Sequence, residues 1–431
     1  MRVRTSEPPG RKSARIHDII RRYRPEAGPF EQIYKDLHAN PELSCQELQT
    51  AQVAAGHLRS LGLKVIDHLG GSGVIGVLEN GHGRTVLLRA ELDALPVLEK
   101  TSLPYASTKH MIDDDGEKKP VMHACGHDMH IASLMAATTL LVNAMDRWSG
   151  RLLIVFQPNE ERGGGAAAMI NDGLYGSRGV PRPDVVLGQH IVNSKAGIVE
   201  IGSGYALAGK KTLSITIPGK GGHAGDPHKC IDPLVIACYT VTRMQSVVSR
   251  ELDPNETAII TCGKLRAGDA PNVIPDKAEM AIEVRAYSPE ILDQAVESLK
   301  RVVRAECQAS GINQEPVILE LESVPPLVNS DEIVQPLERQ LKEFFGATKV
   351  QPLVPDMSAD DFSLLAPDGI PYAYWTMGCT DPEVWEKHQR EGKLQELPAN
   401  HSPYFFPAIE PTLESSIDAL AVAALTFLDT S

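Results

Sequence analysis

The sequence is poor in positive charge, in long apolar runs and in cysteine, and each shortage excludes a class of protein. Lys and Arg number 42 and Asp and Glu number 56 among 431 residues, so the formal net charge is −14. Nucleic-acid phosphates and anionic membrane surfaces attract basic patches, and we therefore expect no nucleic-acid partner and no membrane partner. The longest apolar run, residues 419–428, is well short of the roughly 20 residues that span a bilayer.

The seven cysteines are scattered and odd in number, so they do not suggest a disulfide framework. This usage is typical of a reducing compartment and predicts a cytoplasmic protein. Residues 1–25 are rich in Arg, as organellar transit peptides are. Because Glu7, Pro8 and Pro9 would interrupt an early amphipathic helix, we expect residues 1–25 to form a flexible tail instead.

Residues 26–204 have the pattern of an α/β domain. A helical pattern covers 30–61 with a break at Asn40-Pro41, and a long helix is expected at about 129–145. Short apolar runs predict buried strands at 64–66, 73–78, 85–89, 151–156 and 184–187. Strands that alternate with helices favour a mixed, mostly parallel sheet flanked by helices.

The pattern changes near residue 205. Polar and apolar residues alternate over 211–217, which predicts a strand with one solvated face. Helices are expected at 233–251 and 289–310, and further strands at 258–262, 279–284 and 316–321. This order is that of a small ferredoxin-like α+β domain. Since the α/β pattern resumes after Pro326, residues 205–325 are expected to be inserted into a catalytic domain formed by 26–204 and 326–431.

Residues able to bind a divalent cation follow the predicted strands, where ligand sites form in open α/β sheets. The first group is His123, Cys125 and His127. On an extended segment these three would lie on one side, and Gly126 would permit a tight bend between the last two. The group could instead consist of ordinary loop residues at a helix start, or of a Cys–His nucleophilic pair.

The second group is Glu160-Glu161, shortly after the strand that ends at Phe156. Neighbouring side chains on an extended backbone point opposite ways. One carboxylate could therefore bind a metal while the other takes a proton from an activated water. Solvated charges at a strand end are the alternative. His190 at the end of strand 184–187 and His401 in a loop before the last helix are uninformative alone.

Several segments taken together resemble a family of dinuclear metal amidohydrolases, which includes aminoacylases, hippurate hydrolases and plant auxin-conjugate hydrolases. These enzymes are related to bimetal carboxypeptidases and dipeptidases. The resemblance runs from about Leu37 to Leu428. The matching segments are LHANPE (37–42), RAELDALP (89–96), HACGHD (123–128), QPNEE (157–161), GKGGHA (219–224), NVIPD (272–276) and NHSP (400–403).

The resemblance implies a set of metal ligands and a base. The ligands would be Cys125, His127, Glu161, His190 and His401. Cys125 would bridge two metal ions, and Glu160 would be the general base. Glu91 and Asp128 are expected to orient the ligands by hydrogen bonding without binding a metal ion themselves.

The resemblance also implies roles for the inserted domain. His223, Asn272 and Arg285 would bind the substrate carboxylate or stabilise the developing oxyanion, for which Arg and imidazole are suited. In many members this domain is a lid that forms the dimer contact, and the histidine that matches His223 can serve the partner subunit. We expect a homodimer.

Some positions depart from the family pattern. Glu91 stands where the family usually has Asp, Gln189 replaces a more apolar residue, and Ala359-Asp360 replaces a Ser-Glu pair. Residues 108–120 form an insertion with several charges. No departure removes a ligand, so we expect them to affect substrate choice more than catalysis.

We therefore predict a metal-dependent amidohydrolase that cleaves the amide bond of N-acyl amino acids or similar amino-acid conjugates. It would hold two divalent metal ions per subunit. Thiolate, imidazole and carboxylate ligands favour Zn²⁺ or Mn²⁺, with Ni²⁺ and Co²⁺ also suited. The alternatives are a dipeptidase or carboxypeptidase on the same scaffold, and a catalytically inactive, metal-poor binding protein.

Overall fold

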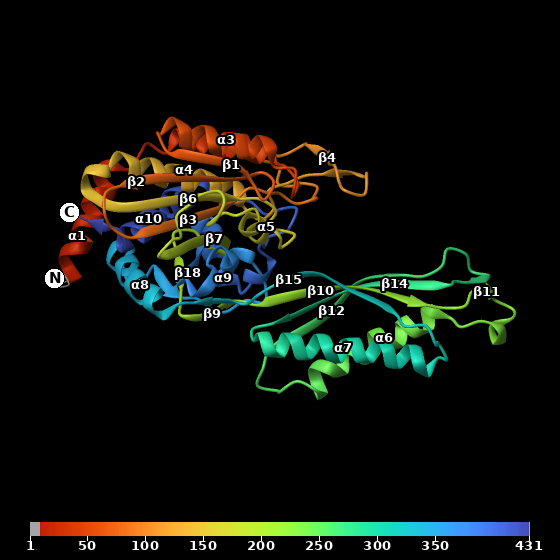
Figure 1. The fold of residues 1–431 in the computed structure, drawn as a ribbon. Helices are drawn as coiled ribbons and strands as arrows, with labels where there is room; N and C mark the ends of the chain where they lie inside the picture. Colours follow the sequence, from red (N-terminus) through yellow and green to blue (C-terminus); the bar gives the residue numbers. More distant parts are fainter. Residues whose placement is uncertain (1–8, 431) are drawn as a thin grey trace. The chain divides into compact units, whose positions relative to one another are not determined.

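The computed structural model describes residues 9–430, which divide into two compact units (Figure 1). Unit 1 comprises the described chain up to Ala206, Val328–Val354 and the described residues from Asp361 onward. Unit 2 comprises Leu207–Leu327 and Pro355–Asp360. The chain crosses between the units within β9 (Gly204–Leu207) and β16 (Leu327–Asn329), two short strands that pair with each other, and crosses again on either side of Pro355–Asp360.

Unit 1 is built on a nine-stranded sheet of order β1-β2-β6-β3-β7-β18-β8-β17, to which β19 adds by pairing with β6. The central neighbours β6, β3, β7 and β18 run parallel, and the flanking pairs β1–β2 and β2–β6 are antiparallel. The predicted fold class, a mixed sheet with parallel strands flanked by helices, is confirmed. The strand bounds are β1 (Lys64–Leu69), β2 (Gly73–Asn80), β3 (Thr85–Glu91), β6 (Trp148–Gln157), β7 (Val185–Lys195), β8 (Val199–Ile201), β17 (Val350–Pro352), β18 (Tyr372–Thr380) and β19 (Asp429–Thr430).

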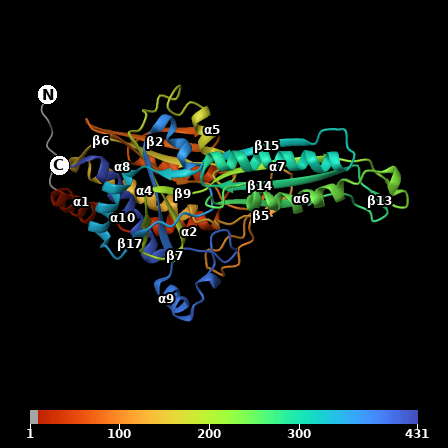
Figure 2. The same ribbon diagram turned by 90° about the horizontal axis from the view of Figure 1, so that it is seen from below.

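Helices flank this sheet, and a small hairpin of β4 (His110–Ile112) and β5 (Lys118–Pro120) lies in the predicted insertion. The helices are α1 (Pro9–Tyr23), α2 (Gly28–Ala39), α3 (Leu48–Ser60), α4 (His127–Asn143), α5 (Gly165–Asn171), α8 (Asp331–Phe345), α9 (Pro382–Glu391) and α10 (Ile409–Phe427). Helices α4 and α10 pack on each other and on the central strand β3 (Figures 1 and 2). Helix α4 is apolar on nearly every side, and its burial between sheet and helices follows from that composition.

The start of α4 requires a glycine. Gly126 precedes the helix with φ +82°, and a Cβ at this position would lie 2.2 Å from Cδ1 of Ile191 in β7. Any larger residue would both strain the backbone and collide with the neighbouring strand. The predicted bend between Cys125 and His127 is present, but His127 lies in the first turn of a helix, not in an extended segment.

The structure differs from the flexible tail that we expected at residues 1–25. Helix α1 covers Pro9–Tyr23 and buries Ile16, Ile19 and Ile20 against the core of unit 1. These isoleucines have the i, i+3, i+4 spacing of one helix face. Pro9 does not break the helix, because proline is tolerated in the first turn. Residues 1–8 lie outside the described residues.

Unit 2 contains the predicted ferredoxin-like arrangement. Its sheet has the order β12-β14-β10-β15 with every neighbouring pair antiparallel. The elements are β10 (Gly209–Pro218), α6 (Pro233–Arg250), β12 (Ala258–Arg266), β14 (Lys277–Ala286), α7 (Pro289–Ala309) and β15 (Val317–Val324), with a second small sheet of β11 (Gly222–His223) and β13 (Val273–Ile274). Alternate residues of β10 and β14 are buried under α6 and α7. For β10, this burial agrees with the polar–apolar alternation over 211–217.

Candidate metal centre

The five predicted ligands come together in unit 1 from separate segments of the chain. Cys125 Sγ lies 3.5 Å from Nε2 of His190, and His401 Nε2 lies 3.4 Å from a carboxylate oxygen of Glu161. Cys125, His127 and Glu161 each offer a ligand atom, and these atoms lie within 4.8 Å of one another. All but His401 are almost completely buried.

The histidines present one nitrogen each to the centre of this cluster. His127 Nδ1 is 2.8 Å from the carbonyl oxygen of Asp93, and His190 Nδ1 is 2.7 Å from that of Ile191. Each Nδ1 is therefore a donor, which leaves Nε2 to face the cluster, where a metal ion would take the place of any proton on it. Nε2 of His127 and Oε1 of Glu161 are buried and have no hydrogen-bond partner within residues 9–430. Buried donor atoms of this kind fit a divalent cation.

The electrostatics of the cluster also fit a cation. Burial opposes a charge on His127, but its hydrogen bond to Asp93 and the carboxylates of Glu91 and Glu161 raise its pKa to about 10. Burial raises the pKa of Glu161 to about 7, with His127 opposing the rise and Asp93 adding to it. Burial and the neighbouring carboxylates likewise hold the pKa of the Cys125 thiol well above its usual value. A bound cation would relieve this accumulation of negative charge.

Glu160 lies beside the ligands but not in the expected extended segment. Strand β6 ends at Gln157, Asn159 has φ +51°, and Glu160 and Glu161 follow in a turn. Both glutamates consequently approach the same atom: their carboxylates are 3.8 Å and 3.9 Å from Nε2 of His127. The strand-based expectation of opposite directions was therefore wrong, although the two carboxylates do share the site.

Several supporting residues were missed from the sequence. Asp93 Oδ2 accepts hydrogen bonds from the Glu161 backbone N–H (3.0 Å) and from Ser44 Oγ (2.7 Å). Asn400 Nδ2 donates to the carbonyl of Ile191, and the His401 N–H donates to the carbonyl of Ala124. Asp93 and Asn400 lie in segments that matched the family, so the sequence could have indicated that they belong to the site.

Glu91 and Asp128, the residues expected to orient the ligands, are buried and have other direct partners. Glu91 accepts a hydrogen bond from His130 Nδ1 at 2.7 Å and forms an ion pair with Arg89. Asp128 lies 2.6 Å from Nδ1 of His38 in α2. Neither carboxylate has a hydrogen bond to one of the five ligand side chains among the bonds that the structure gives for it.

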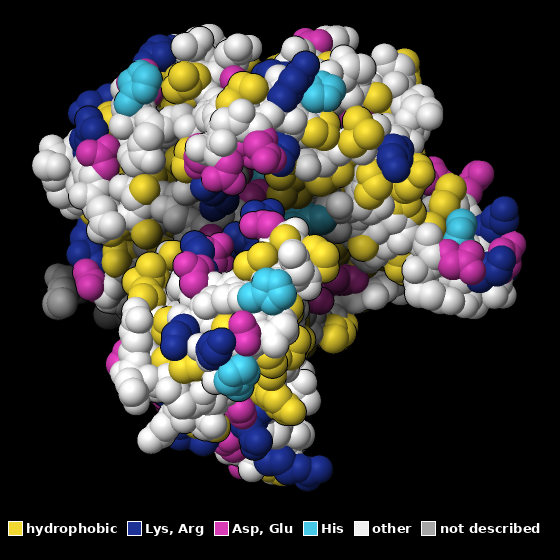
Figure 3. Space-filling model, turned by 90° about the vertical axis from the view of Figure 1, so that its right-hand side faces the viewer, with side chains coloured by type: hydrophobic (Ala, Val, Ile, Leu, Met, Phe, Trp, Pro, Cys, Tyr) yellow, Lys and Arg dark blue, Asp and Glu magenta, His cyan; other side chains and the backbone are white. Residues whose placement is uncertain are grey.

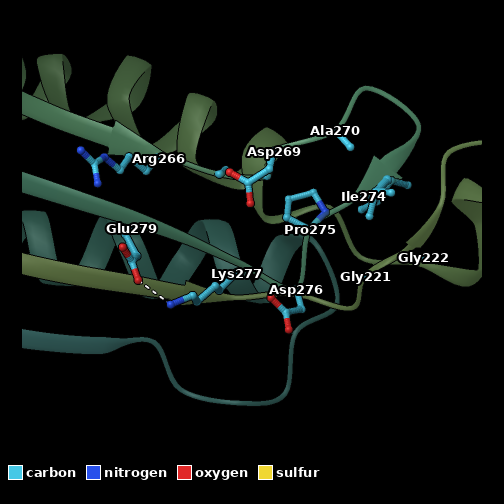
Figure 4. A pocket seen from close by; sticks show the side chains of 13 residues that line it. Gly221, Gly222, Arg266, Asp269, Ala270, Ile274, Pro275, Asp276, Lys277 and Glu279 are labelled. Atoms are coloured by element: carbon cyan, nitrogen blue, oxygen red, sulfur yellow. Dashed lines mark hydrogen bonds and ion pairs between the residues drawn. The ribbon is translucent and has the colours of Figure 1, made fainter.

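The candidate residues of unit 2 are less enclosed. His223 and Asn272 are exposed, and His223 Nδ1 accepts a hydrogen bond from the Gly225 N–H at 3.0 Å. Arg285 donates to Glu283 and to the carbonyl of Met357, both at 2.6 Å. The small sheet that contains His223 borders an open hollow of about 590 Å³ (Figure 4). Its lining carries charges of both signs, including the pair of Lys277 and Glu279.

Comparison with known proteins assigns the family. The model of peptidase family M20/M25/M40 matches residues 87–399. A hippurate hydrolase of Campylobacter jejuni is 37% identical over 343 residues, which cover 78% of this chain and 84% of that protein. The chain belongs to peptidase family M20/M25/M40. The family resemblance that the sequence motifs indicated is therefore confirmed, and the protein is a hydrolase.

Two further relatives of this M20/M25/M40 hydrolase bear on its chemistry. Thermostable carboxypeptidase 2 of Saccharolobus solfataricus is 34% identical over 337 residues, covering 77% of this chain and 81% of the carboxypeptidase. A crystal structure of a dinuclear metal binding peptidase of the M20 family from Bacillus subtilis has a TM-score of 0.69 at 25% identity. That likeness covers 93% of this chain and 98% of the peptidase.

Two further features of the hydrolase concern membrane-spanning helices and surface charge. Within residues 9–430, no helix has the length and apolar character needed to cross a membrane. On the face shown in Figure 3, Lys and Arg side chains lie among Asp and Glu side chains.

Proposed function

We propose that this hydrolase is a dinuclear metal-dependent amidohydrolase that cleaves the amide bond of N-acyl amino acids. The observation that carries the proposal is the convergence of five potential ligands with a further carboxylate, Glu160, beside them. The ligand set is Cys125, His127, Glu161, His190 and His401. A thiolate, imidazoles and a carboxylate favour Zn²⁺ or Mn²⁺. The hippurate hydrolase relative supports an acylated amino acid as the substrate class.

The chemistry divides between the metal ions and Glu160. Two divalent ions, when bound, would lower the pKa of a water from 15.7 to about 7 and polarise the substrate carbonyl. Glu160 accepts one proton of the attacking water while the water oxygen bonds to the amide carbon. When the C–N bond breaks, Glu160 passes that proton to the leaving nitrogen. The products are a carboxylic acid and a free amino acid.

Unit 2 would supply substrate-binding groups. His223 and Asn272 would donate hydrogen bonds to the oxyanion that forms during attack, and Arg285 would bind the carboxylate of the amino-acid half. Arg285 already pairs with Glu283, so a substrate carboxylate would have to share or replace that partner. As a second part of the proposal, unit 2 forms a homodimer contact, and His223 acts in the partner's site.

The direct test is Glu160→Gln in protein reconstituted with Zn²⁺ or Mn²⁺. We expect kcat on N-acetyl and N-benzoyl amino acids to fall by about 10²–10⁴ because the proton acceptor is lost. Metal content, measured by mass spectrometry, should remain at the wild-type value. Glu332→Gln, at an exposed position in α8, is the control. Near-normal turnover of Glu160→Gln would remove this residue from the proposed role.

A carboxypeptidase or dipeptidase is the second candidate, and the carboxypeptidase relative favours keeping it. The two functions differ in whether the substrate has a free α-amine. Parallel assays on N-acyl amino acids and on dipeptides with the same C-terminal residue would separate them. A metal content near zero after reconstitution, with no turnover, would instead favour a binding protein. Light scattering during size-exclusion chromatography would test the dimer.

A further inference from the structure

His130 lies among the proposed ligands but has no role in the proposed function. It is in α4 almost one turn after His127, and it is 2% exposed. Its ring centroid lies 4.5 Å from that of His190 and 5.5 Å from that of His127. Together with Glu91, these three histidines could hold a metal ion by proximity alone.

The hydrogen bonds of His130 exclude it as a ligand. The Ile191 backbone N–H donates to Nε2 of His130 at 2.8 Å, so Nε2 uses its lone pair as an acceptor. Nδ1 then carries the proton and donates to Glu91 Oε2 at 2.7 Å. Both nitrogens are occupied, and the two bonds define a single tautomer. The imidazole therefore has no lone pair left for a cation.

The other end of this contact is held by a buried charge pair. Glu91 is fully buried and pairs with Arg89, which is 1% exposed. Arg89 in turn donates from Nε to Gln157 Oε1 at 3.0 Å, so β3 and the end of β6 fix the guanidinium. The Glu91 carboxylate, which accepts the hydrogen bond from His130, is consequently held in place independently of His130.

Ile191 connects His130 to a proposed ligand. The same residue that donates its N–H to His130 accepts, at its carbonyl, the hydrogen bond from His190 Nδ1 at 2.7 Å. That second bond sets the direction of His190 Nε2, which faces Cys125 Sγ. We infer that His130 is a positioning residue, which anchors the Ile191 backbone to the Arg89–Glu91 pair and thereby aims His190 at the metal. The inference rests on the proposed metal centre.

Two substitutions of His130 test its two hydrogen bonds one at a time. In His130→Asn, the amide nitrogen replaces Nδ1 and keeps the bond to Glu91, but the shorter side chain does not reach Ile191. In His130→Gln, the amide oxygen can replace Nε2 and keep the bond to Ile191. Ser133→Ala is the matched control, because Ser133 is buried in the same helix and its hydroxyl has no hydrogen-bond partner in the part of the chain that the structure describes.

The measurement is the dissociation constant for Zn²⁺ and for Mn²⁺, obtained by competition with a chromogenic chelator on the full-length protein. We expect His130→Asn to weaken metal binding by about 10–100-fold, as loss of a ligand-orienting partner typically does. His130→Gln should recover most of that loss, and Ser133→Ala should bind as the wild type does. Thermal unfolding without metal checks that each variant folds.

The outcomes separate this inference from the proposed function. If the wild type does not bind either metal, the proposed metal centre fails. If the wild type binds and His130→Asn binds equally well, or if Gln and Asn weaken binding alike, the positioning role is overturned. Should His130→Asn not fold, His130→Gln still tests the role: because it can keep the bond to Ile191, it should bind metal nearly as tightly as the wild type, and a loss as large as that expected for His130→Asn would overturn the role.

Discussion

The two units prepare their candidate functional residues in different ways. In unit 1 the residues around the candidate metal centre are buried and bonded to one another through fixed backbone groups. In unit 2, His223 and Asn272 are exposed, and Arg285 is bonded to residues of its own unit. Buried charges without partners are costly, and exposed side chains are nearly free to change. Substitutions of the buried residues that support the metal centre in unit 1 should therefore alter stability or metal binding, whereas those of the candidate residues in unit 2 should alter only rates.

The strongest test of this difference is Arg89→Met. It removes the guanidinium that pairs with the fully buried Glu91 carboxylate. Breaking a buried pair from one side typically costs about 3–5 kcal/mol. We expect the free energy of unfolding in urea to fall by that amount. Arg151→Met, which breaks an exposed pair with Glu79 in the neighbouring strands, is the control and should cost less than about 1 kcal/mol. Equal losses would contradict the contrast between buried and exposed pairs.

His223→Ala is the corresponding test in unit 2. If the imidazole donates to the oxyanion, kcat should fall by about 10²–10³, equivalent to roughly 2.7–4 kcal/mol. The unfolding midpoint and the metal content should not change, because the side chain is exposed. His228→Ala, at another exposed histidine of the same unit, serves as the control. A destabilised but active His223→Ala would show that the residue is structural.

A pH experiment tests the charge of His38, a buried residue of unit 1 that is bonded to Asp128, the residue after His127. Both nitrogens of His38 face carboxylate oxygens, at 2.6 Å from Asp128 and 3.0 Å from Glu99, so both must be donors. Burial opposes this charge, but the two acidic partners outweigh burial and raise the pKa of His38 to about 9. Because the folded-state pKa exceeds the usual 6.5, the stabilisation is fully present below pH 6.5 and is lost as the pH rises through 9.

The variant His38→Gln should therefore be less stable than the wild type at pH 6, and this difference should shrink by roughly 3 kcal/mol towards pH 10. Urea unfolding at several pH values would measure it. His57→Gln is the control, because burial lowers the pKa of His57 and its difference should not shrink over this range. A difference for His38→Gln that is independent of pH would show that the imidazole is neutral.

Apolar patterns predicted the elements of both units well, since burial of branched residues determines the strands. The limits of β7 were predicted less well. The sequence indicated a strand at 184–187, but β7 continues to Lys195. Its polar second half is held by parallel pairing with β18, a partner almost 200 residues away in the chain. Pairing of this kind has no local sequence signal.

The ligands could be predicted only as a set. His401 is an exposed loop residue with φ +69°, and its place depends on the bond from its N–H to the Ala124 carbonyl. The role of Ile191 could not be predicted at all, because it acts through backbone atoms that every residue has. The direction of Glu160 and Glu161 was missed because a turn replaces the expected strand end.

The smallest effect on stability is expected at the ion pair that joins the insertion at 108–120 to the segment after Glu161. Asp114 in the β4–β5 hairpin pairs at 2.7 Å with Arg162, which directly follows Glu161. Both side chains are at least half exposed, so Asp114→Ala should change the free energy of unfolding by no more than about 1 kcal/mol, and less at high salt. Metal affinity should be unaffected, because Asp93 fixes the Glu161 backbone from inside the protein. Asp115→Ala in the same hairpin is the control. A loss of metal affinity specific to Asp114→Ala would show that an exposed ion pair helps to hold the ligands, and the division between buried support and exposed variable residues would then be wrong at this point.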